Sequence, residues 1–189
     1  GTSCPDPPRD LYNGGLRVFR VTDETGEQVP EPDTADTPLI GSFRPSICCT
    51  DAAFHGSLMD VYVKTAGDAQ AVWATYGPSG EETGSGLLVL RAEWTGSGVI
   101  FPPSMITKIP LNPVQVGDEG SRLTYDPARD VLYASFATSG VAMYDVSDPY
   151  TPSEMGKFQW AQPDGHGRTS LQVWPGPGNY VYVSLMSWG

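Results

Sequence analysis

The sequence has few basic residues and no long hydrophobic run. Its 189 residues include 11 Lys and Arg against 22 Asp and Glu, which gives a formal net charge of -11. This charge would repel a phosphate backbone, so the composition argues against nucleic-acid binding. No apolar stretch approaches the ~20 residues that a transmembrane helix requires, which argues against a membrane span. Solubility of a secreted protein is the simple interpretation of the charge, and a calcium-binding surface is the alternative.

Cysteine is also scarce, and the three cysteines cannot all pair within the chain. Cys4 lies near the start, whereas Cys48 and Cys49 are adjacent. We expect Cys4 to pair with one of the two, leaving the other free or bonded elsewhere; a Cys48–Cys49 disulfide and buried free thiols are the alternatives. This pattern predicts an extracytoplasmic location, whether secreted, periplasmic or at the cell surface. The chain starts at Gly1 rather than Met, so we expect a processed or trimmed product.

The sequence is rich in residues that form turns. It holds 22 Gly and 18 Pro, and only 17% of its residues are charged. This composition predicts many tight turns between short elements, a profile typical of an all-β protein. The length fits one domain with its own hydrophobic core.

Two strand patterns recur along the chain. In one, a glycine precedes an apolar strand that ends in a polar residue; the other is a strand rich in β-branched and aromatic residues. The first pattern occurs at 15–20, 86–91 and 140–145, the second at 72–76, 132–136 and 181–185, and flanking strands are expected at 104–109 and 153–158. About four antiparallel strands per repeat predict the blades of a β-propeller.

The repeat divides the chain, which we take as a single propeller segment over 1–189, into four parts. Residues 11–44 supply a half blade with an acidic hairpin, 45–112 and 117–160 form complete blades, and 164–189 begin another half blade. This makes about three blades, whereas closed propellers have 4 to 8. A half blade also leaves an unpaired strand edge. We therefore expect a second polypeptide, further copies or missing residues to complete the ring; an open β-sandwich is the alternative.

Residues 130–158 carry a recognisable signature. The run DVLYAS at 130–135, followed by GVAMYDVSDPYTP at 140–152, resembles the LVIVD repeat, a type of propeller blade. It is also distantly similar to the blades of the selenium-binding protein and methanethiol oxidase family, in which channel histidines are implicated in metal chemistry. Arg20 and Arg91 stand where this blade has Asp145, so the resemblance covers one blade.

The acidic residues of this signature have a local explanation. Asp145 and Asp148 can accept backbone N–H bonds in the turn, while Pro149 and Pro152 restrict φ and direct the chain onward. We predict that both aspartates stabilise the turn. A bound cation is the alternative, although Asp-x-x-Asp alone lacks the ligand number that calcium requires.

The only two histidines fall at similar places in the repeat. His55 and His166 each precede a glycine, and Glu119 stands at the matching place of the intervening blade. All three are expected to open the strand that lines the central channel. Two imidazoles and a carboxylate would suit a divalent transition metal such as Cu, Zn or Fe, with calcium a poorer fit. The other interpretation is that these residues cap turns or line the channel without chemistry.

Three aspartates lie shortly before these positions. Asp51, Asp118 and Asp164 are candidates for outer partners that orient the metal ligands. Cys48 or Cys49 as a thiolate ligand is a further alternative. The sequence identifies no catalytic residue, because it has neither a phosphate-binding loop nor a nucleophile elbow.

Two functions from different classes remain. The first is a secreted or surface propeller segment that serves as a binding or assembly platform. The second is a subunit of a metal-dependent propeller enzyme, an oxidase or hydrolase with a small molecule as its ligand and its site in the central channel. Propellers host both classes, so the fold alone does not choose between them.

Overall fold

The structure, a computed structural model, describes residues 16–19, 39–43, 57–67, 69–77, 84–96, 98–111, 120–137, 139–159 and 168–187. This part of the chain is built from antiparallel β-strands with one short 3-10 turn and no α-helix. The predicted all-β class is confirmed. Within the same residues, nothing helical has the length and apolar character needed to cross a bilayer.

The strands form four antiparallel sheets, each made of strands that are consecutive in the sequence. The first sheet holds β1 (Leu16–Phe19) and β2 (Leu39–Phe43). The second holds β3 (Ser57–Ala66), β4 (Ala69–Gly77), β5 (Gly86–Trp94), β6 (Val99–Ile100) and β7 (Ile106–Pro110). The third holds β8 (Gly120–Asp126), β9 (Val131–Phe136), β10 (Gly140–Asp145) and β11 (Ser153–Phe158), and the fourth holds β12 (Arg168–Pro175) and β13 (Val181–Ser187).

The outer edge of the second sheet differs from the prediction. A strand was expected over 104–109, but Pro103–Met105 form a 3-10 turn and β7 begins at Ile106. Pro102 and Pro103 have no N–H to donate to a ladder, and the Met105 N–H closes the turn on the Pro102 carbonyl at 2.9 Å. As a result β6 and β7 pair with successive parts of β5, on either side of the turn.

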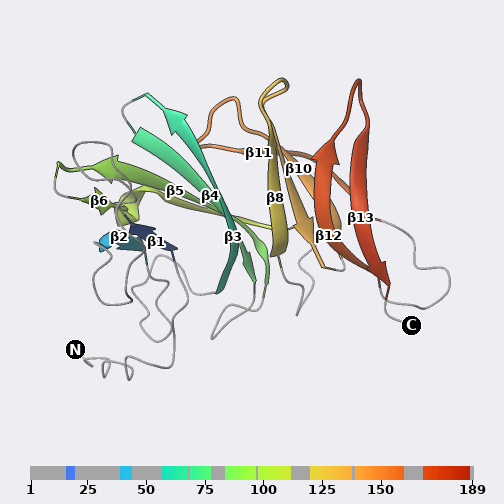
Figure 1. Ribbon diagram of the computed structural model, residues 1–189, viewed down its shortest axis with the longest axis horizontal. Coiled ribbons are helices and arrows are strands. Elements are labelled where there is room, and N and C mark those ends of the chain that lie inside the picture. The colour runs from blue at the N-terminus through green and yellow to red at the C-terminus, as the bar shows by residue number, and fades with distance from the viewer. Residues whose placement is uncertain are drawn as a thin grey trace, which may run out of the picture.

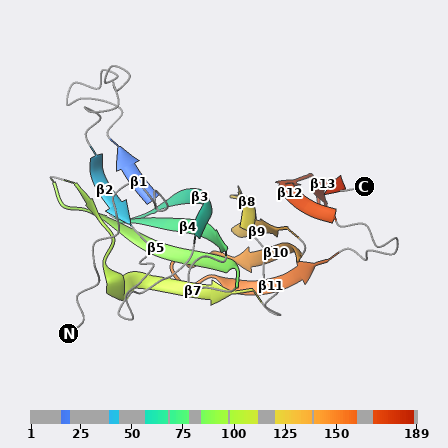
Figure 2. The ribbon, with the colours of Figure 1, turned by 90° about the horizontal axis from the view of Figure 1, so that it is seen from below.

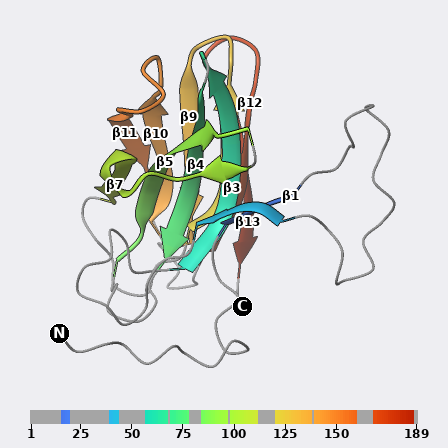
Figure 3. The same ribbon diagram turned by 90° about the vertical axis from the view of Figure 1, so that its left-hand side faces the viewer.

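The sheets lie side by side in chain order (Figure 1). Seen from below, β3, β8 and β12 lie along one side of the molecule, and β7 and β11 lie along the opposite side (Figure 2). We call β3, β8 and β12 the inner strands; β8 contacts both of the others. Figure 3 views the arrangement from the end that carries the first sheet. We call the face of a sheet that looks toward the preceding sheet its N-side face, and the opposite face its C-side face.

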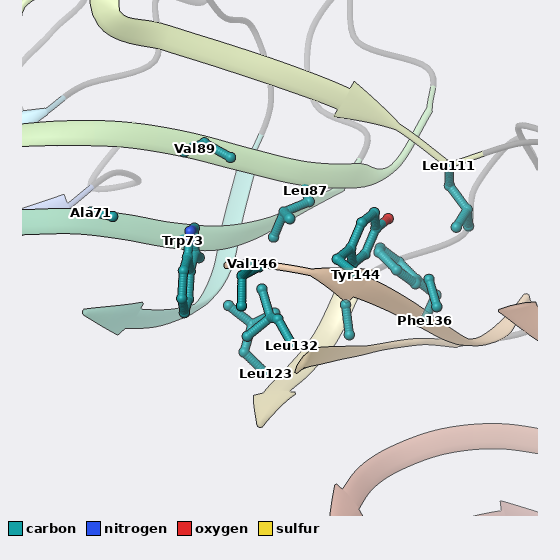
Figure 4. Close-up of a cluster of buried hydrophobic side chains, with 12 residues drawn as sticks. Ala71, Trp73, Leu87, Val89, Leu111, Leu123, Leu132, Phe136, Tyr144 and Val146 are labelled. Carbon is teal, nitrogen blue, oxygen red and sulfur yellow. The ribbon is translucent and has the colours of Figure 1, made fainter. Parts of the chain in front are cut away.

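Hydrophobic clusters fill the spaces between adjacent sheets. The largest lies between the second and third sheets, and Figure 4 shows side chains such as Leu87 and Tyr144 converging from the two sides. A second cluster joins the third sheet to Val173 of the fourth. β9 is buried along its whole length because it is sandwiched between two sheets. Its alternate residues therefore belong to different clusters, as Leu132 and Tyr133 do.

None of the four sheets closes on itself within the described residues. The architecture that the structure shows is an open stack of antiparallel sheets. These residues do not show a ring of blades around an axis.

Candidate interaction surfaces at the two ends of the stack

The residues predicted to form a metal site lie outside the described residues. These are His55, His166 and Glu119 together with Asp51, Asp118 and Asp164; the same holds for Cys4, Cys48 and Cys49. Within the described ranges, no three His, Cys, Asp or Glu side chains cluster as metal ligands. What the structure does describe is the set of strands that His55, Glu119 and His166 precede.

The pairing register gives the spacing of these three positions from matching residues of the inner strands. Each inner strand has a β-bulge near its start, between Leu58 and Asp60 in β3, with counterparts in β8 and β12. Each inner strand pairs with the strand that follows it, β4, β9 or β13, and these three strands carry the repeated pattern at 72–76, 132–136 and 181–185. Through this pairing Leu58 matches Gly120 and Ser170. Glu119 therefore lies one residue before the matched position, whereas His55 lies three before it and His166 four.

Side chains of each inner strand bind the backbone of the next one. The Leu123 N–H of β8 donates to Asp60 Oδ2 of β3 at 2.8 Å. The Thr124 hydroxyl of β8 donates to the Val173 carbonyl of β12 at 2.7 Å. Leu123 and Val173 occupy the same repeat position, because they pair with the matching residues Ala134 and Val183. Both junctions thus join a side chain of one inner strand to the backbone of the next, through an acceptor side chain at the first junction and a donor side chain at the second.

A charged cluster fastens the second sheet to the third. Lys64 Nζ donates to Asp130 Oδ1 at 2.7 Å and to the Val146 carbonyl at 3.3 Å. The Tyr125 hydroxyl donates to the same Asp130 oxygen at 2.5 Å, and Lys64 lies 4.9 Å from the centroid of the Tyr125 ring. Trp73 adds a second aromatic ring at 5.9 Å from Lys64 and donates its Nε1–H to the Pro149 carbonyl at 2.8 Å. Cation–π contacts and a charge-assisted hydrogen bond therefore act together here.

The cluster shifts the titration of its members. Hydrogen bonds from Lys64 and Tyr125 hold the pKa of the Asp130 carboxyl below its ordinary value. Burial acts to lower the pKa of Lys64, but its hydrogen bonds with Asp130 and Tyr125 outweigh burial, and the pKa is raised. Burial and the bond to Asp130 raise the pKa of Tyr125. Near neutral pH the cluster is a Lys64–Asp130 ion pair beside a neutral phenol.

The turn aspartates behave as predicted. Asp145 Oδ1 accepts the Ser147 N–H at 2.9 Å, and Asp148 Oδ1 accepts the Tyr150 N–H at 3.0 Å. Asp148 Oδ2 also accepts from the Thr151 hydroxyl at 2.8 Å. These bonds lower the pKa of both carboxyls. The prediction that the two aspartates stabilise the turn is confirmed.

One repeat position changes from buried to exposed along the stack. Trp73, Tyr133 and Tyr182 match one another on the C-side faces of the second, third and fourth sheets. Their exposed fractions are 0%, 5% and 61%. Tyr182 is exposed because no described sheet covers the C-side face of the fourth sheet. Together with its cross-strand neighbour Trp174, which is 47% exposed, Tyr182 forms what we call the open C-face.

The opposite end shows the same change on the N-side faces. Val61, Leu123 and Val173 occupy matching positions on the three inner strands. Leu123 and Val173 are 7% and 1% exposed, whereas Val61 of the first inner strand is 43% exposed. Val63, two residues on and on the same face, is 48% exposed. We call Val61 and Val63 the open N-face.

A shallow pocket adjoins the open N-face. It has a volume of about 250 Å³ and includes Thr65, Gln70 and the exposed Trp94 among its lining residues. Its walls carry no charged side chain. The pocket is therefore a continuation of the same largely apolar face rather than a site with its own chemistry.

Sequence reasoning missed the polar residues that join the sheets. Asp60 and Lys64 are polar positions within an otherwise apolar strand, and this break in the pattern is a signal that could have identified them. Comparison of the chain with protein-family models, with curated proteins and with solved structures gives no match.

Proposed function

We propose that the chain is a segment of a β-propeller that serves as a binding and assembly platform outside the cytoplasm, with a further polypeptide seated on its open faces. One observation carries the proposal: the position of Trp73 and Tyr133 is buried, whereas its match Tyr182 is 61% exposed. Burying one large aromatic side chain is worth ~1.5–3 kcal/mol, so an exposed face of this kind favours a partner.

The arrangement of the strands supports a propeller in particular. The third sheet has the strand order β11-β10-β9-β8, which is the sequential antiparallel order of a blade. Asp60 and Lys64 of β3 contact the third sheet at Leu123 and Asp130, in the same order along the chain. The inner strands therefore run in the same direction, as they do around a propeller channel. A bulge at the same place in each of them is consistent with one repeated unit.

The mass of the native assembly tests this proposal. We expect the chain recovered from the cells that produce it to have a mass well above the 20.3 kDa of one copy. Tyr182→Asp should lower that mass, because it places a carboxylate in the buried contact. Met155→Asp is the matched control, since Met155 is also 61% exposed but lies on the outer strand β11. Recovery of the wild-type chain as a single copy would contradict the platform.

A metal-dependent enzyme is the second candidate. It is favoured by the contacts of β8 with both β3 and β12, since these are the three strands that His55, Glu119 and His166 precede in the sequence. Imidazole with carboxylate suits Zn, Cu or Fe. Elemental analysis of the purified protein tests it: one transition-metal ion per chain is expected, and its absence after purification in metal-supplemented buffer would contradict the enzyme.

A further inference from the structure

The two open faces are the two halves of one contact that the chain already makes twice. At the junction of the second and third sheets, Trp73 lies on the C-side face and Leu123 on the N-side face. At the junction of the third and fourth sheets, Tyr133 and Val173 take these places. Tyr182 presents the C-side half on the fourth sheet, and Val61 presents the N-side half on the part of the second sheet that stays exposed beside the first sheet. A surface that fits one end is therefore present at the other end of the same molecule.

The hydrogen bond of Asp60 at the junction of the second and third sheets has a candidate counterpart in β12. Asp60 matches Gln172 of β12, because they pair with the matching residues Thr75 and Ser184. Asp60 accepts the N–H of Leu123, whose match in β3 is Val61. A Gln172 side chain placed against β3 of another molecule can accept the Val61 N–H in the same way, since an amide carbonyl is an acceptor.

The strand edges are complementary as well. In the described residues the fourth sheet has an inner strand and a second strand, and the edge of β13 away from β12 has no ladder partner. The first sheet consists of β1 and β2, and β1 follows the same glycine-led pattern as β10, the strand that pairs with β9. A β1 strand beside β13 would extend the fourth sheet to the order β12-β13-β1-β2, which is the order of the complete third sheet.

We propose that the occupant of the open C-face is the open N-face of a second copy of this chain, with β1 of that copy paired to β13. This inference rests on the proposed function and names its partner. The described residues of each copy form two complete sheets and two half sheets. Two such sets joined at both ends make six sheets, a number within the 4 to 8 that close a propeller. The contact is head-to-tail, and a closed pair leaves neither face open.

Analytical ultracentrifugation of the purified chain tests the second copy. The expected species is a dimer of 40.6 kDa, twice the 20.3 kDa of one chain. Tyr182→Asp and Val61→Asp should each weaken it at least about 100-fold, because both place an unpaired carboxylate in the contact. Met155→Asp should leave the dimer unchanged. Far-UV circular dichroism confirms folding of the variants, whose altered side chains are exposed in the single chain.

Mixing the two variants separates a head-to-tail contact from a symmetric one. Tyr182→Asp leaves the N-face intact and Val61→Asp leaves the C-face intact, so a mixture of the two should form a mixed dimer that neither forms alone. If C-faces met each other, Val61→Asp would have no effect and the mixture would give no rescue; that result overturns the proposal.

A purified chain that stays a single copy at about 100 µM also overturns it, since a contact of this kind should associate at far lower concentration. If that chain nevertheless associates with a different polypeptide in the cells that produce it, the proposed second copy is wrong and the proposed platform stands. If the chain is a single copy both after purification and in those cells, the second copy and the platform are both wrong.

Discussion

Substitution of matching aromatic residues by alanine should have very different effects on stability, depending on their place in the stack. Trp73 and Tyr182 occupy the same repeat position, but Trp73 is fully buried and Tyr182 is 61% exposed. The Trp73 ring stacks on Tyr62 with centroids 5.9 Å apart and lies 5.5 Å from Tyr125 of the third sheet. Trp73→Ala removes these contacts and opens a cavity between two sheets.

The size of the effect follows from the burial. Replacing a buried tryptophan by alanine costs about 3–5 kcal/mol in free energy of unfolding. Trp73→Phe keeps an aromatic ring against Tyr62 and loses the Nε1–H donor, which leaves the partly buried Pro149 carbonyl without its 2.8 Å hydrogen bond; we expect about 1–2 kcal/mol. Tyr182→Ala should cost no more than about 0.5 kcal/mol in the single chain, because little of its surface is buried there.

Urea denaturation followed by far-UV circular dichroism measures these free energies. The protein concentration must be low enough for single chains, since association adds to apparent stability by mass action. If the slope of the unfolding free energy against urea concentration is the same in wild type and in all three variants, the same two-state transition is measured in each. The assignment of buried and open faces is wrong if Trp73→Ala costs less than about 1 kcal/mol, or if Tyr182→Ala costs as much as Trp73→Ala.

Three further predictions test other parts of the structure. Lys64→Met should lower Tm at neutral pH, where Lys64 and Asp130 are both charged. The pKa of Asp130 lies below 3.8 and that of Lys64 above 10.5, so the difference in Tm from wild type should shrink as the pH falls below 3.8 or rises above 10.5. A difference in Tm that does not depend on pH would contradict the ion pair. Gly140→Ala should cost at least about 1 kcal/mol in free energy of unfolding by urea, because Gly140 has a φ of 87° and a Cβ there would lie 2.1 Å from a backbone oxygen. Gly156→Ala should be close to neutral, because the atom nearest to its added Cβ is 3.7 Å away. If the chain binds a metal, the double variant His55→Ala, His166→Ala should lose it in elemental analysis, and retention of the metal would exclude both histidines as ligands.

The strands could be predicted because their signals are local. Runs rich in β-branched and aromatic residues mark β4, β9 and β13 in the sequence, and the structure has all three. The turn after β10 was equally accessible, since Asp145 and Asp148 bind backbone groups two residues further on. Local hydrogen bonds of this kind depend only on neighbouring residues, so the sequence is sufficient to predict them.

The contacts between sheets could not be predicted in the same way. Lys64 and Asp130 are 66 residues apart, and their ion pair depends on how two sheets pack rather than on any pattern within one strand. Likewise, Tyr133 and Tyr182 have the same sequence context, which predicts the face on which each lies but not whether another sheet covers that face. Burial of a repeated position is a property of the neighbouring unit.

The open C-face differs from the internal junctions in one respect that bears on assembly. Lys64 of β3 and Asp126 of β8 occupy matching positions at the ends of their strands, and both take part in charged contacts to the next sheet. Lys64 binds Asp130 directly. Asp126 acts through Arg129, which donates to Asp126 and to the Gly176 carbonyl. Gly176 itself takes the matching place at the end of β12 and has no side chain to offer. The open C-face therefore depends on its two aromatic rings rather than on charge. Since hydrophobic contacts are not screened by salt, association through this face should persist at high ionic strength.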